Sequence, residues 1–354
     1  MNLALTYKIN KSKVILLSLG SLLLITFLVS LTIGAVPINF KDVVQMILGQ
    51  IGLQSDAISS VQQTVLTNIR LPRLVQTVLV GGALGISGAA LQGLFRNPLV
   101  EPSLIGVSGG AAVFVVIYIV FTNAFPSFIT NISSAYTVPF FAFAGGLCAT
   151  LLVFKLSSTG GRTNIAVLIL TGVAINALTA AVIGLAIYYA DDNQLRTFTF
   201  WTLGDLGGAT WEKLKFASVM LITPSLALVY FNKKLNALAL GEAEAFHLGV
   251  NVEQTKYSII LLSALAVGTA VSISGMIGFV GLIIPHMIRL LFGPNHDWLL
   301  PGSILGGAVL LLVSDIIART IVVPSELPIG IVTALLGAPF FIWLLLSAKH
   351  KRMI

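Results

Sequence analysis

The sequence predicts an all-α polytopic membrane protein with about ten transmembrane helices. Its 354 residues are 56% hydrophobic and only 9% charged, and the mean hydropathy is +0.99. Soluble domains carry about 25% charged residues, so this composition excludes a soluble fold. The stretch from Arg70 to Ala111 shows the pattern most clearly, because two glycine-rich apolar runs flank the polar break Arg96-Asn97-Pro98. Such a break is expected where the chain turns at the membrane boundary.

The first apolar run follows three lysines and is long enough to cross a membrane. Lys8, Lys11 and Lys13 precede the run Val14–Val36. The apolar core of a cleavable signal peptide has about 7–15 residues, whereas about 20 apolar residues span the bilayer. We therefore predict an uncleaved first helix behind a cytoplasmic tail of residues 1–13.

Nine further apolar runs complete a predicted single domain, a ten-helix bundle over residues 14–347 with a second tail at 348–354. The predicted spans are 14–36, 71–95, 99–121, 136–156, 164–190, 214–231, 257–275, 279–292, 299–321 and 328–347. The eighth is short for a full span. It is expected to be tilted, or to continue from a half-buried turn at Gly275–Gly278.

The distribution of basic residues predicts that both termini are cytoplasmic. Lysine and arginine accumulate on the cytoplasmic side of membrane proteins, so the net charge of +7 reports orientation. Ten spans from a cytoplasmic N-terminus place 13 of the 20 basic residues on the inner side. The outer side holds Lys41, Arg70, Arg73, Arg196, Lys213, Lys215 and Arg319. No basic block is long enough for a nucleic-acid surface, so membrane lipid is an expected partner and nucleic acid is not.

Two connecting segments are long enough to hold structure of their own. The outer segment Pro37–Ile69 contains Gly49, Gly52 and scattered polar residues, which is compatible with a short surface helix. The inner segment, residues 232–256, has apolar side chains near helical spacing between two glycine breaks. These side chains are Leu238, Leu240, Ala243 and Phe246, and the breaks are Gly241 and Gly249. We predict two short amphipathic helices that dock a partner at the cytoplasmic face, with a plain connecting loop as the alternative.

A weak internal repeat divides the chain into two halves of five spans. Ser87-Gly88 in the first half corresponds to Ser274-Gly275 in the second, and Gly109-Gly110-Ala111 to Gly306-Gly307-Ala308. Because five is odd, the halves would cross the membrane in opposite directions. Inverted halves are common in transporters, where they let access alternate between the two sides. Glycines one helical turn apart, as at Gly81 and Gly85, predict close helix packing.

No catalytic constellation is visible. Residues 106–110 match the G-x-S-x-G nucleophile elbow around Ser108, but that elbow needs a preceding strand, and here it opens a transmembrane helix. The four histidines have no metal-binding spacing, and a single cysteine makes neither a disulfide nor a zinc site. His286 is expected to have a hydrogen-bonded packing role rather than to contact substrate or metal. The chain is therefore predicted to bind no metal and no cofactor.

Two ionisable residues in the ninth span raise a second class of function. Asp315 and Arg319 are four residues apart and can pair on one helix face. If the carboxylate of Asp315 is unpaired and faces a transport pathway, it indicates an ion-coupled carrier. If it pairs with Arg319 near the outer surface, its role is structural. The chain contains no Gly-Lys dipeptide, so it lacks the P-loop that binds ATP. An ATP-driven transporter of this kind needs its ATPase on another chain.

Six motifs in combination resemble those of the permease subunits of type II ATP-binding-cassette (ABC) importers for iron–siderophore, haem and cobalamin. The motifs are RLPR at 70–73, SGAALQGLFRNPLVEPSLIGVSGGA at 87–111, FWTLGDLGGATW at 200–211, LALGEAEAFHLGV at 238–250, SGMIGFVGLIIPHMIRL at 274–290 and ELPIGIVTALLGAPFFIWLL at 326–345. The resemblance extends from about Ile69 to Leu346, and the main departure is a longer N-terminus. It implies ten spans in two inverted halves, the type II importer permease fold, and a dimer of permeases around a central pathway.

The resemblance implies two ABC ATPase subunits below the permease dimer and one extracytoplasmic substrate-binding protein above it. ATP and magnesium would be used by the ATPase and not by this chain. Residues 239–249 match the coupling helices that enter a cleft on the ATPase. The residues assigned to this contact are Ala239, Leu240, Gly241, Glu242, Ala243, Phe246, Leu248 and Gly249.

Two further sites follow from the resemblance. Arg70, Arg73 and Arg319 match outer basic positions that pair with glutamates of the binding protein, a contact that would steer docking. Thr163 and Asn164 resemble the cytoplasmic gate. The fifth and tenth spans would line the pathway.

The resemblance implies import across the bacterial cytoplasmic membrane by alternating access, with no chemistry performed by this chain. An iron–siderophore complex is the expected cargo, and haem and cobalamin are the alternatives. The permease dimer is either a homodimer or a heterodimer. The alternative from another class is an ion-coupled secondary transporter, which predicts transport that depends on a mid-membrane acid such as Asp315.

Overall fold

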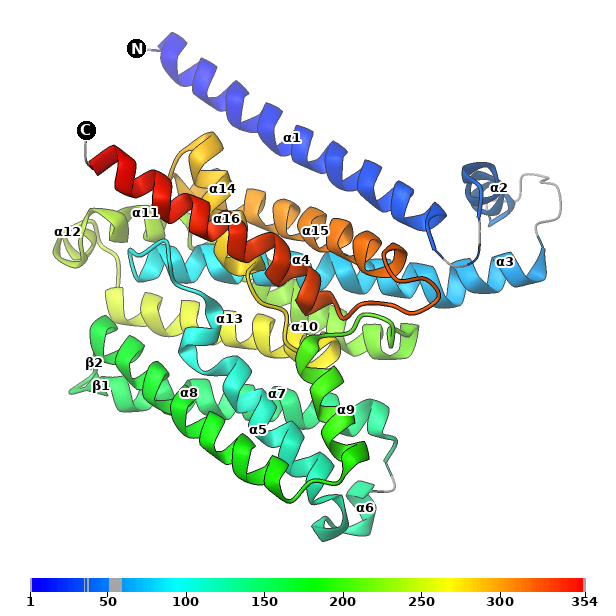
Figure 1. Cartoon of the computed structure of the whole chain (residues 1–354). Coiled ribbons are helices and arrows are strands. Elements are labelled where there is room, and N and C mark those ends of the chain that lie inside the picture. The colour runs from blue at the N-terminus through cyan, green and yellow to red at the C-terminus, as the bar shows by residue number, and fades with distance from the viewer. Residues whose placement is uncertain (1, 35, 37, 51–58, 131, 353–354) are drawn as a thin grey trace.

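The computed structural model describes residues 2–34, 36, 38–50, 59–130 and 132–352 as a bundle of long helices (Figure 1). The helices are α1 Asn2–Thr32, α2 Phe40–Gln50, α3 Ser60–Thr64, the π-helical η1 Val65–Arg70, α4 Leu71–Leu94, the 3-10 turn η2 Pro102–Ile105, α5 Val107–Val120, η3 Thr122–Ala124, α6 Ser127–Thr130, α7 Ser134–Ser157, α8 Ile165–Tyr188, α9 Asp192–Leu203, α10 Trp211–Val229, α11 Asn232–Leu240, α12 Glu242–His247, α13 Val252–Ser274, α14 Val280–Phe292, α15 His296–Thr320 and α16 Ile329–Arg352. Two short strands, β1 Ser158–Thr159 and β2 Arg162–Thr163, separate α7 from α8. The terminal face is the end of the bundle that holds both chain ends and α12, and the distal face is the opposite end, with α2 and α3 (Figure 1).

Each of the ten predicted spans coincides with a helix. Among the described residues, six helical stretches are long and apolar enough to cross a membrane, namely α1, α3 through α4, α7, α8, α13 and α15. The pair α10 and α11, bent by 50°, passes the same test as one broken span. Shorter apolar helices supply the remaining three, α5, α14 and α16. The short eighth span is therefore confirmed, because α13 stops at Ser274 and the chain becomes helical again only at Val280.

The centre of the bundle is α4, which is mostly buried and packs against α15, α14, α13 and α10. Backbones approach closely at its glycines. A Cβ atom added to Gly88 would lie 1.9 Å from the carbonyl oxygen of Gly281, and one added to Gly85 would lie 2.1 Å from that of Ser303. Only glycine leaves this space, so the predicted role of the glycine spacing in helix packing is confirmed.

The two halves are inverted, as their long buried helices show. The helix α4 begins at the distal face, whereas α13 begins at the terminal face and runs the opposite way (Figure 1). Each is followed by an irregular segment, residues 95–101 or 275–279. In the second segment Phe279 has φ 69° and donates its N–H to Glu101 Oε1 at 2.8 Å. The carboxylate thereby satisfies a backbone group that the break leaves open inside the bundle.

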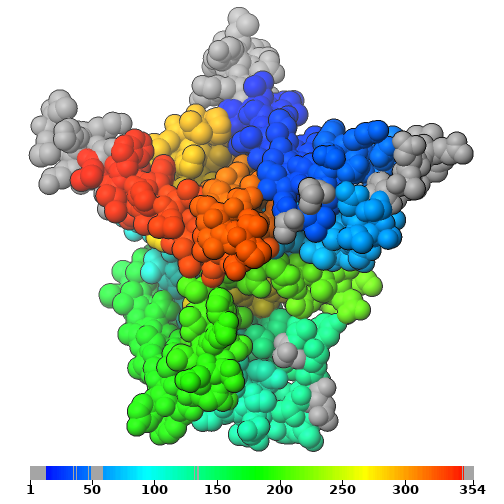
Figure 2. Space-filling model, turned by 45° about the vertical axis from the view of Figure 1, so that its right-hand side comes forward, coloured from blue at the N-terminus to red at the C-terminus, as the bar shows by residue number. Residues whose placement is uncertain are grey.

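Two long apolar helices lie at the surface of the bundle. Little of α1 or α8 is buried, and Leu170 and Leu178 of α8 are largely exposed. Figure 2 shows the residues near both chain ends gathered on one side of the molecule and those near 120–205 on the other. Apolar surface of this extent is covered in a membrane by lipid or by another membrane protein.

The terminal helices are longer than the predicted spans. The helix α1 begins at Asn2 and so includes most of the predicted tail 1–13, and α16 runs to Arg352 through most of the predicted tail 348–354. Met1 and residues 353–354 lie outside the described residues. The predicted surface helix of the outer segment is α2. Pro37 and residues 51–58, including Gly52, also lie outside the described residues.

Candidate functional site

The coupling segment was predicted over residues 232–256. Residues 232–249 of it, which are called the coupling segment from here on, lie at the terminal face as two helices joined by one glycine (Figure 1). Gly241, between α11 and α12, has φ 140°, and Gly249, after α12, has φ 82°. Residues with a side chain rarely adopt these angles, so glycine permits both turns. The prediction of two short helices broken by glycines is confirmed.

Large apolar side chains of the coupling segment point away from the bundle. Leu240 is 68% exposed, Phe246 70% and Leu248 64%. Ala245 of α12 is fully buried and fixes the helix to the bundle. Of the other assigned residues, Ala239, Ala243 and Gly249 are exposed, Glu242 is half-buried and Gly241 is buried. This apolar patch at the end of the bundle has the character of a protein contact surface.

The other end of the coupling segment is tied to α15. Asn236 of α11 donates its Nδ2 to Asn295 Oδ1 at 2.8 Å, and its Oδ1 accepts the N–H of His296 at 2.9 Å. Asn295 is the residue that caps α15. No local pattern predicts this contact, because its partners are about sixty residues apart in the sequence. It holds α11 to one of the long helices of the bundle.

A β-hairpin that the sequence did not predict precedes α8. The strands β1 and β2 pair antiparallel, with Ser158 opposite Thr163. Gly160 and Gly161 form the turn with φ 60° and 76°. Two positive φ angles are typical of a two-residue hairpin turn, and the Gly-Gly dipeptide was the signal available in the sequence.

The predicted gate residues stand where this hairpin meets α8. Thr163 is its last strand residue and is buried. Asn164 caps α8, because its Oδ1 accepts the N–H groups of Ala166 at 2.9 Å and Val167 at 3.2 Å. The position of the hairpin therefore sets the start of α8. The gating role of Thr163 and Asn164 stays a prediction.

One buried side chain joins the hairpin to the coupling segment. Lys256 Nζ donates to the carbonyl oxygen of Thr163 at 2.9 Å, to Glu242 Oε2 at 2.9 Å and to Glu253 Oε1 at 3.0 Å. An ammonium group has three donors, so all of them are used. Glu253 Oε2 accepts the N–H of Thr163 at 2.8 Å. These four residues form the lysine cluster.

Sequence reasoning missed the lysine cluster and placed Lys256 among the basic residues of an inner loop. Glu253 and Lys256 are three residues apart on one helix, a spacing that signals their pair alone. The Lys256 side chain is only 3% exposed, whereas those of Glu242 and Glu253 are 40% and 34% exposed. The cluster borders a cavity of about 730 Å³ that reaches Arg96. A second cavity, of about 1000 Å³, lies between the hairpin and α12.

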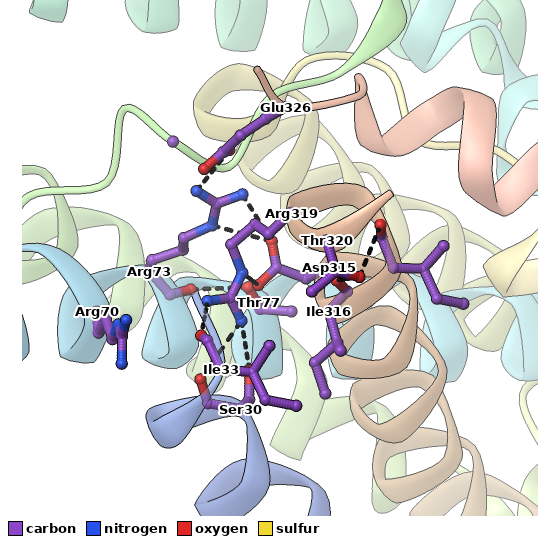
Figure 3. A network of polar contacts seen from close by, with 12 residues as sticks. Ser30, Ile33, Arg70, Arg73, Thr77, Asp315, Ile316, Arg319, Thr320 and Glu326 are labelled. Atoms are coloured by element: carbon purple, nitrogen blue, oxygen red, sulfur yellow. Dashed lines mark hydrogen bonds and ion pairs between the residues drawn. The ribbon is translucent and has the colours of Figure 1, made fainter. Parts of the chain in front are cut away.

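At the distal face four charged side chains form the arginine cluster: Arg73, Asp315, Arg319 and Glu326 (Figure 3). Asp315 is fully buried and pairs with Arg73 Nη2 at 2.9 Å and with Arg319 Nε at 3.0 Å. Arg73 Nη1 also pairs with Glu326 Oε2 at 2.8 Å. The pairing of Asp315 with Arg319 predicted from their spacing is confirmed. The contribution of Arg73 was not predictable, because it comes from a helix 242 residues away.

Two arginines also hold the end of α1. Arg70 Nη1 donates to the carbonyl oxygen of Leu31 at 2.6 Å. Arg319 Nη1 donates to that of Ile33 at 2.8 Å, and its Nη2 to Ser30 Oγ at 2.6 Å (Figure 3). The last carbonyl groups of a helix lack donors within the helix, and positive charge is favourable there. These contacts join α1 to η1, at the start of α4, and to α15.

The three arginines predicted to dock a binding protein therefore have internal partners. Arg70, Arg73 and Arg319 are 5%, 8% and 7% exposed. Charges steer and orient a partner only where the partner reaches them. Docking by these residues stays a prediction, and it now requires that a guanidinium group exchange an internal acceptor for a carboxylate of the partner.

His286 is not hydrogen-bonded, and the prediction of a hydrogen-bonded packing role was wrong. Neither ring nitrogen has a partner within the described part of the chain. The residues of α14 that contact glycines of α4 and α15 are Gly281, Ile284 and Ile288, whereas His286 is half-buried. Ser108 follows the 3-10 turn η2 and opens α5 without a preceding strand, so it is not a nucleophile elbow. No three His, Cys, Asp or Glu side chains of the described residues gather to hold a metal ion.

Comparisons with known proteins agree with this geometry. The model of the FecCD transport family matches residues 22–347. The hemin transport system permease protein HmuU of Yersinia pestis is 42% identical over 339 residues, covering 95% of this chain and 97% of the relative. The cobalamin import system permease protein BtuC of Halobacterium salinarum is 36% identical over 366 residues, covering 94% of this chain and 96% of the relative.

A solved structure shows the same fold. It is an inward-facing conformation of a metal-chelate type ABC transporter, with a TM-score of 0.81 and 37% sequence identity. The match covers 94% of this chain and 99% of that one. The bundle of inverted halves is thus the permease fold of type II ABC importers. The chain belongs to the FecCD transport family, and it is a multi-pass membrane permease of an ABC importer.

Proposed function

We propose that the chain forms the membrane pathway of an ATP-driven importer and depends on a separate ATPase for energy. The observation that carries this proposal is the exposed apolar patch of the coupling segment, Leu240, Phe246 and Leu248, at the end of the bundle. The chain has no P-loop, so ATP and magnesium are used by the partner subunit. Two ATPase subunits bind the terminal faces of two permeases, and both termini are then cytoplasmic.

The second permease covers the exposed apolar side of α8. This helix and α16 line the pathway between the two subunits, as the family resemblance implies. The importer switches between outward and inward access when the ATPase moves the coupling segment and the gate at Thr163 and Asn164 opens or closes. The cytoplasmic membrane of a bacterium is the site of this transport.

The cargo is a metal chelate. The sequence predicts an iron–siderophore complex, and the hemin permease relative favours an iron porphyrin as the first compound to test. Cobalamin is the third compound to test, because relatives named as cobalamin and vitamin B12 import permeases support it. An extracytoplasmic binding protein delivers the cargo at the distal face, where Arg70, Arg73 and Arg319 orient it after exchange of their internal partners.

Uptake in a strain that lacks the gene tests the cargo. Labelled hemin, ferric siderophores and cobalamin are supplied in parallel at limiting concentration. We expect loss of hemin or siderophore uptake, restored by the gene only when its ATPase is present. Restoration without any ATPase would contradict the proposed function.

Co-purification tests the coupling segment. We expect Phe246→Ala to lose the ATPase subunit while the permease still elutes as a folded species. The matched control is Phe216→Ala, which removes a similarly exposed phenylalanine from α10 in the membrane region. Retention of the ATPase by Phe246→Ala, or its equal loss in Phe216→Ala, would contradict the assignment.

A further inference from the structure

Lys256 contacts both the coupling segment and the hairpin that starts α8. We propose that Lys256 is a positioning residue that transmits movement of the ATPase-docking helix α12 to the hairpin and thus to α8. The inference rests on the proposed function, in which α12 binds the ATPase and the hairpin forms the gate. It adds the physical connection between those two sites.

The first observation is that the ammonium group is saturated and enclosed. All three donors are used, and the side chain is 3% exposed. Water reaches the two carboxylates but hardly reaches the ammonium group itself in this arrangement. If Glu242 moves away with α12, a buried charge loses a partner, which is costly unless the group moves as well. The position of Lys256 Nζ thus depends on the position of α12.

The second observation is that the same side chains hold the hairpin by its backbone. Lys256 bonds the carbonyl oxygen of Thr163, and Glu253 bonds its N–H. Hydrogen bonds to the backbone groups of residue 163 hold the chain in place and do not depend on the side chain at that position. Asn164, the next residue, begins α8 through its cap. A change at Lys256 therefore reaches the first turn of α8 through two covalent neighbours.

The third observation is that the two helices of the coupling segment have different attachments. Asn236 ties α11 to the start of α15, inside the long-helix frame. Glu242 binds Lys256 of α13, and Lys256 in turn binds the hairpin, a two-stranded loop flanked by the cavities of about 730 and 1000 Å³. The geometry divides the segment into an anchored helix and a transmitting helix, with Gly241 at the joint.

A fluorescent reporter on the hairpin tests the connection in the complete complex. The exposed Thr159 is replaced by cysteine in a Cys148→Ser background and labelled, and the permease is reconstituted with its ATPase in nanodiscs. We expect the signal of the parent to change on addition of ATP, magnesium and vanadate. In Lys256→Met the change should fall by about fivefold or more, although the ATPase still co-purifies and hydrolyses ATP.

Three further variants separate transmission from mere structural support. Lys155→Met removes an exposed lysine beside the same hairpin and should keep the response. Lys256→Arg, which preserves the charge, should restore at least part of it. Glu242→Gln leaves the bonds of Lys256 to Thr163 and Glu253 in place, so it should weaken the response without loosening the hairpin. In a Lys256→Met background it should have no further effect, because the connection is already broken.

The outcomes distinguish the two proposals. A parent that does not bind an ATPase overturns the proposed function and this inference with it. A parent that responds, with Lys256→Met responding equally, overturns this inference alone, as does equal loss in Lys155→Met. If Lys256→Met fails to fold, Glu242→Gln decides: an undiminished response in that variant overturns the inference, and a diminished one supports it.

Discussion

At the terminal face a buried lysine stands between two glutamates that water reaches, whereas at the distal face a buried aspartate stands between two arginines that water hardly reaches. The side chains of Glu242 and Glu253 are 40% and 34% exposed. Those of Asp315, Arg73 and Arg319 are 0%, 10% and 5% exposed. Charges without access to water cannot be separated without a large loss of free energy, while partly hydrated carboxylates can change partners. Unless a docking partner supplies replacement carboxylates, the arginine cluster is suited to be a fixed joint, whereas the lysine cluster is suited to be an adjustable one.

The two clusters also differ in the structural elements that they connect. The arginine cluster joins α4 and α15 to the segment before α16, all parts of the membrane bundle. The lysine cluster joins α13 to a hairpin and to a six-residue helix, α12. A transporter needs both kinds of joint, because a partner can drive a moving part only against a frame that holds its shape.

Removal of the central carboxylate should give the largest loss of stability. We expect Asp315→Asn to lower the free energy of unfolding by about 3–5 kcal/mol, because two buried guanidinium groups lose their shared counter-charge. Thermal unfolding in detergent measures the change. The matched control is Asp297→Asn, at the exposed start of the same helix. An ion-coupled carrier predicts instead a stable protein without transport, and that result would reverse the structural role of Asp315.

A change of cation at the distal face should give the next largest effect. The guanidinium group of Arg73 contacts Asp315 through Nη2 and Glu326 through Nη1. The ammonium group of a lysine is a single point charge and does not reproduce this planar geometry. We expect Arg73→Lys to cost about 1.5–3 kcal/mol, the worth of one charge-assisted hydrogen bond. Thermal unfolding measures it, with Lys215→Arg at an exposed position as the control. An unchanged midpoint would show that the fork geometry is unimportant.

Loss of the cation from the lysine cluster should cost less stability than loss of Asp315. Lys256→Met leaves Glu242 and Glu253 in contact with water, so the main cost is the unpaired carbonyl group of Thr163, about 1–3 kcal/mol. The same unfolding measurement, run beside Asp315→Asn, makes the comparison direct. If Lys256→Met were the more destabilising of the two, the contrast between a fixed and an adjustable joint would be wrong.

The smallest effect is expected at the exposed edge of the arginine cluster. The Glu326 side chain is 45% exposed. We expect Glu326→Gln to change stability by about 1 kcal/mol or less, as is typical for surface ion pairs. Salt should reproduce the effect in the parent, since the screening length falls to about 3 Å at 1 M. A loss as large as that of Asp315→Asn would mean that Glu326 is enclosed in the membrane protein.

The elements with local signals were predictable and the contacts between distant elements were not. Hydropathy predicted all ten spans, and Gly241 and Gly249 predicted the division of the coupling segment. The helix α9 was missed, although Asp191 and Gln194 form a capping box that marks its start. The lysine cluster was missed because Thr163 and Lys256 are 93 residues apart, so no local spacing reports their contact. The internal partners of Arg70, Arg73 and Arg319 were not predicted, because the sequence shows charge but not burial.

The arginine bonds at the end of α1 have a consequence for the biogenesis of the chain. A ribosome delivers α1 first, Arg70 with the next span, and Arg319 only after some nine-tenths of the chain has been made. The carbonyl groups at the end of α1 are therefore satisfied in two stages, by Arg70 and then by Arg319. A chain that stops before α15 keeps an open first helix at the distal face. The joint at the end of α1 is therefore complete only after α15 has been made and has packed against α1.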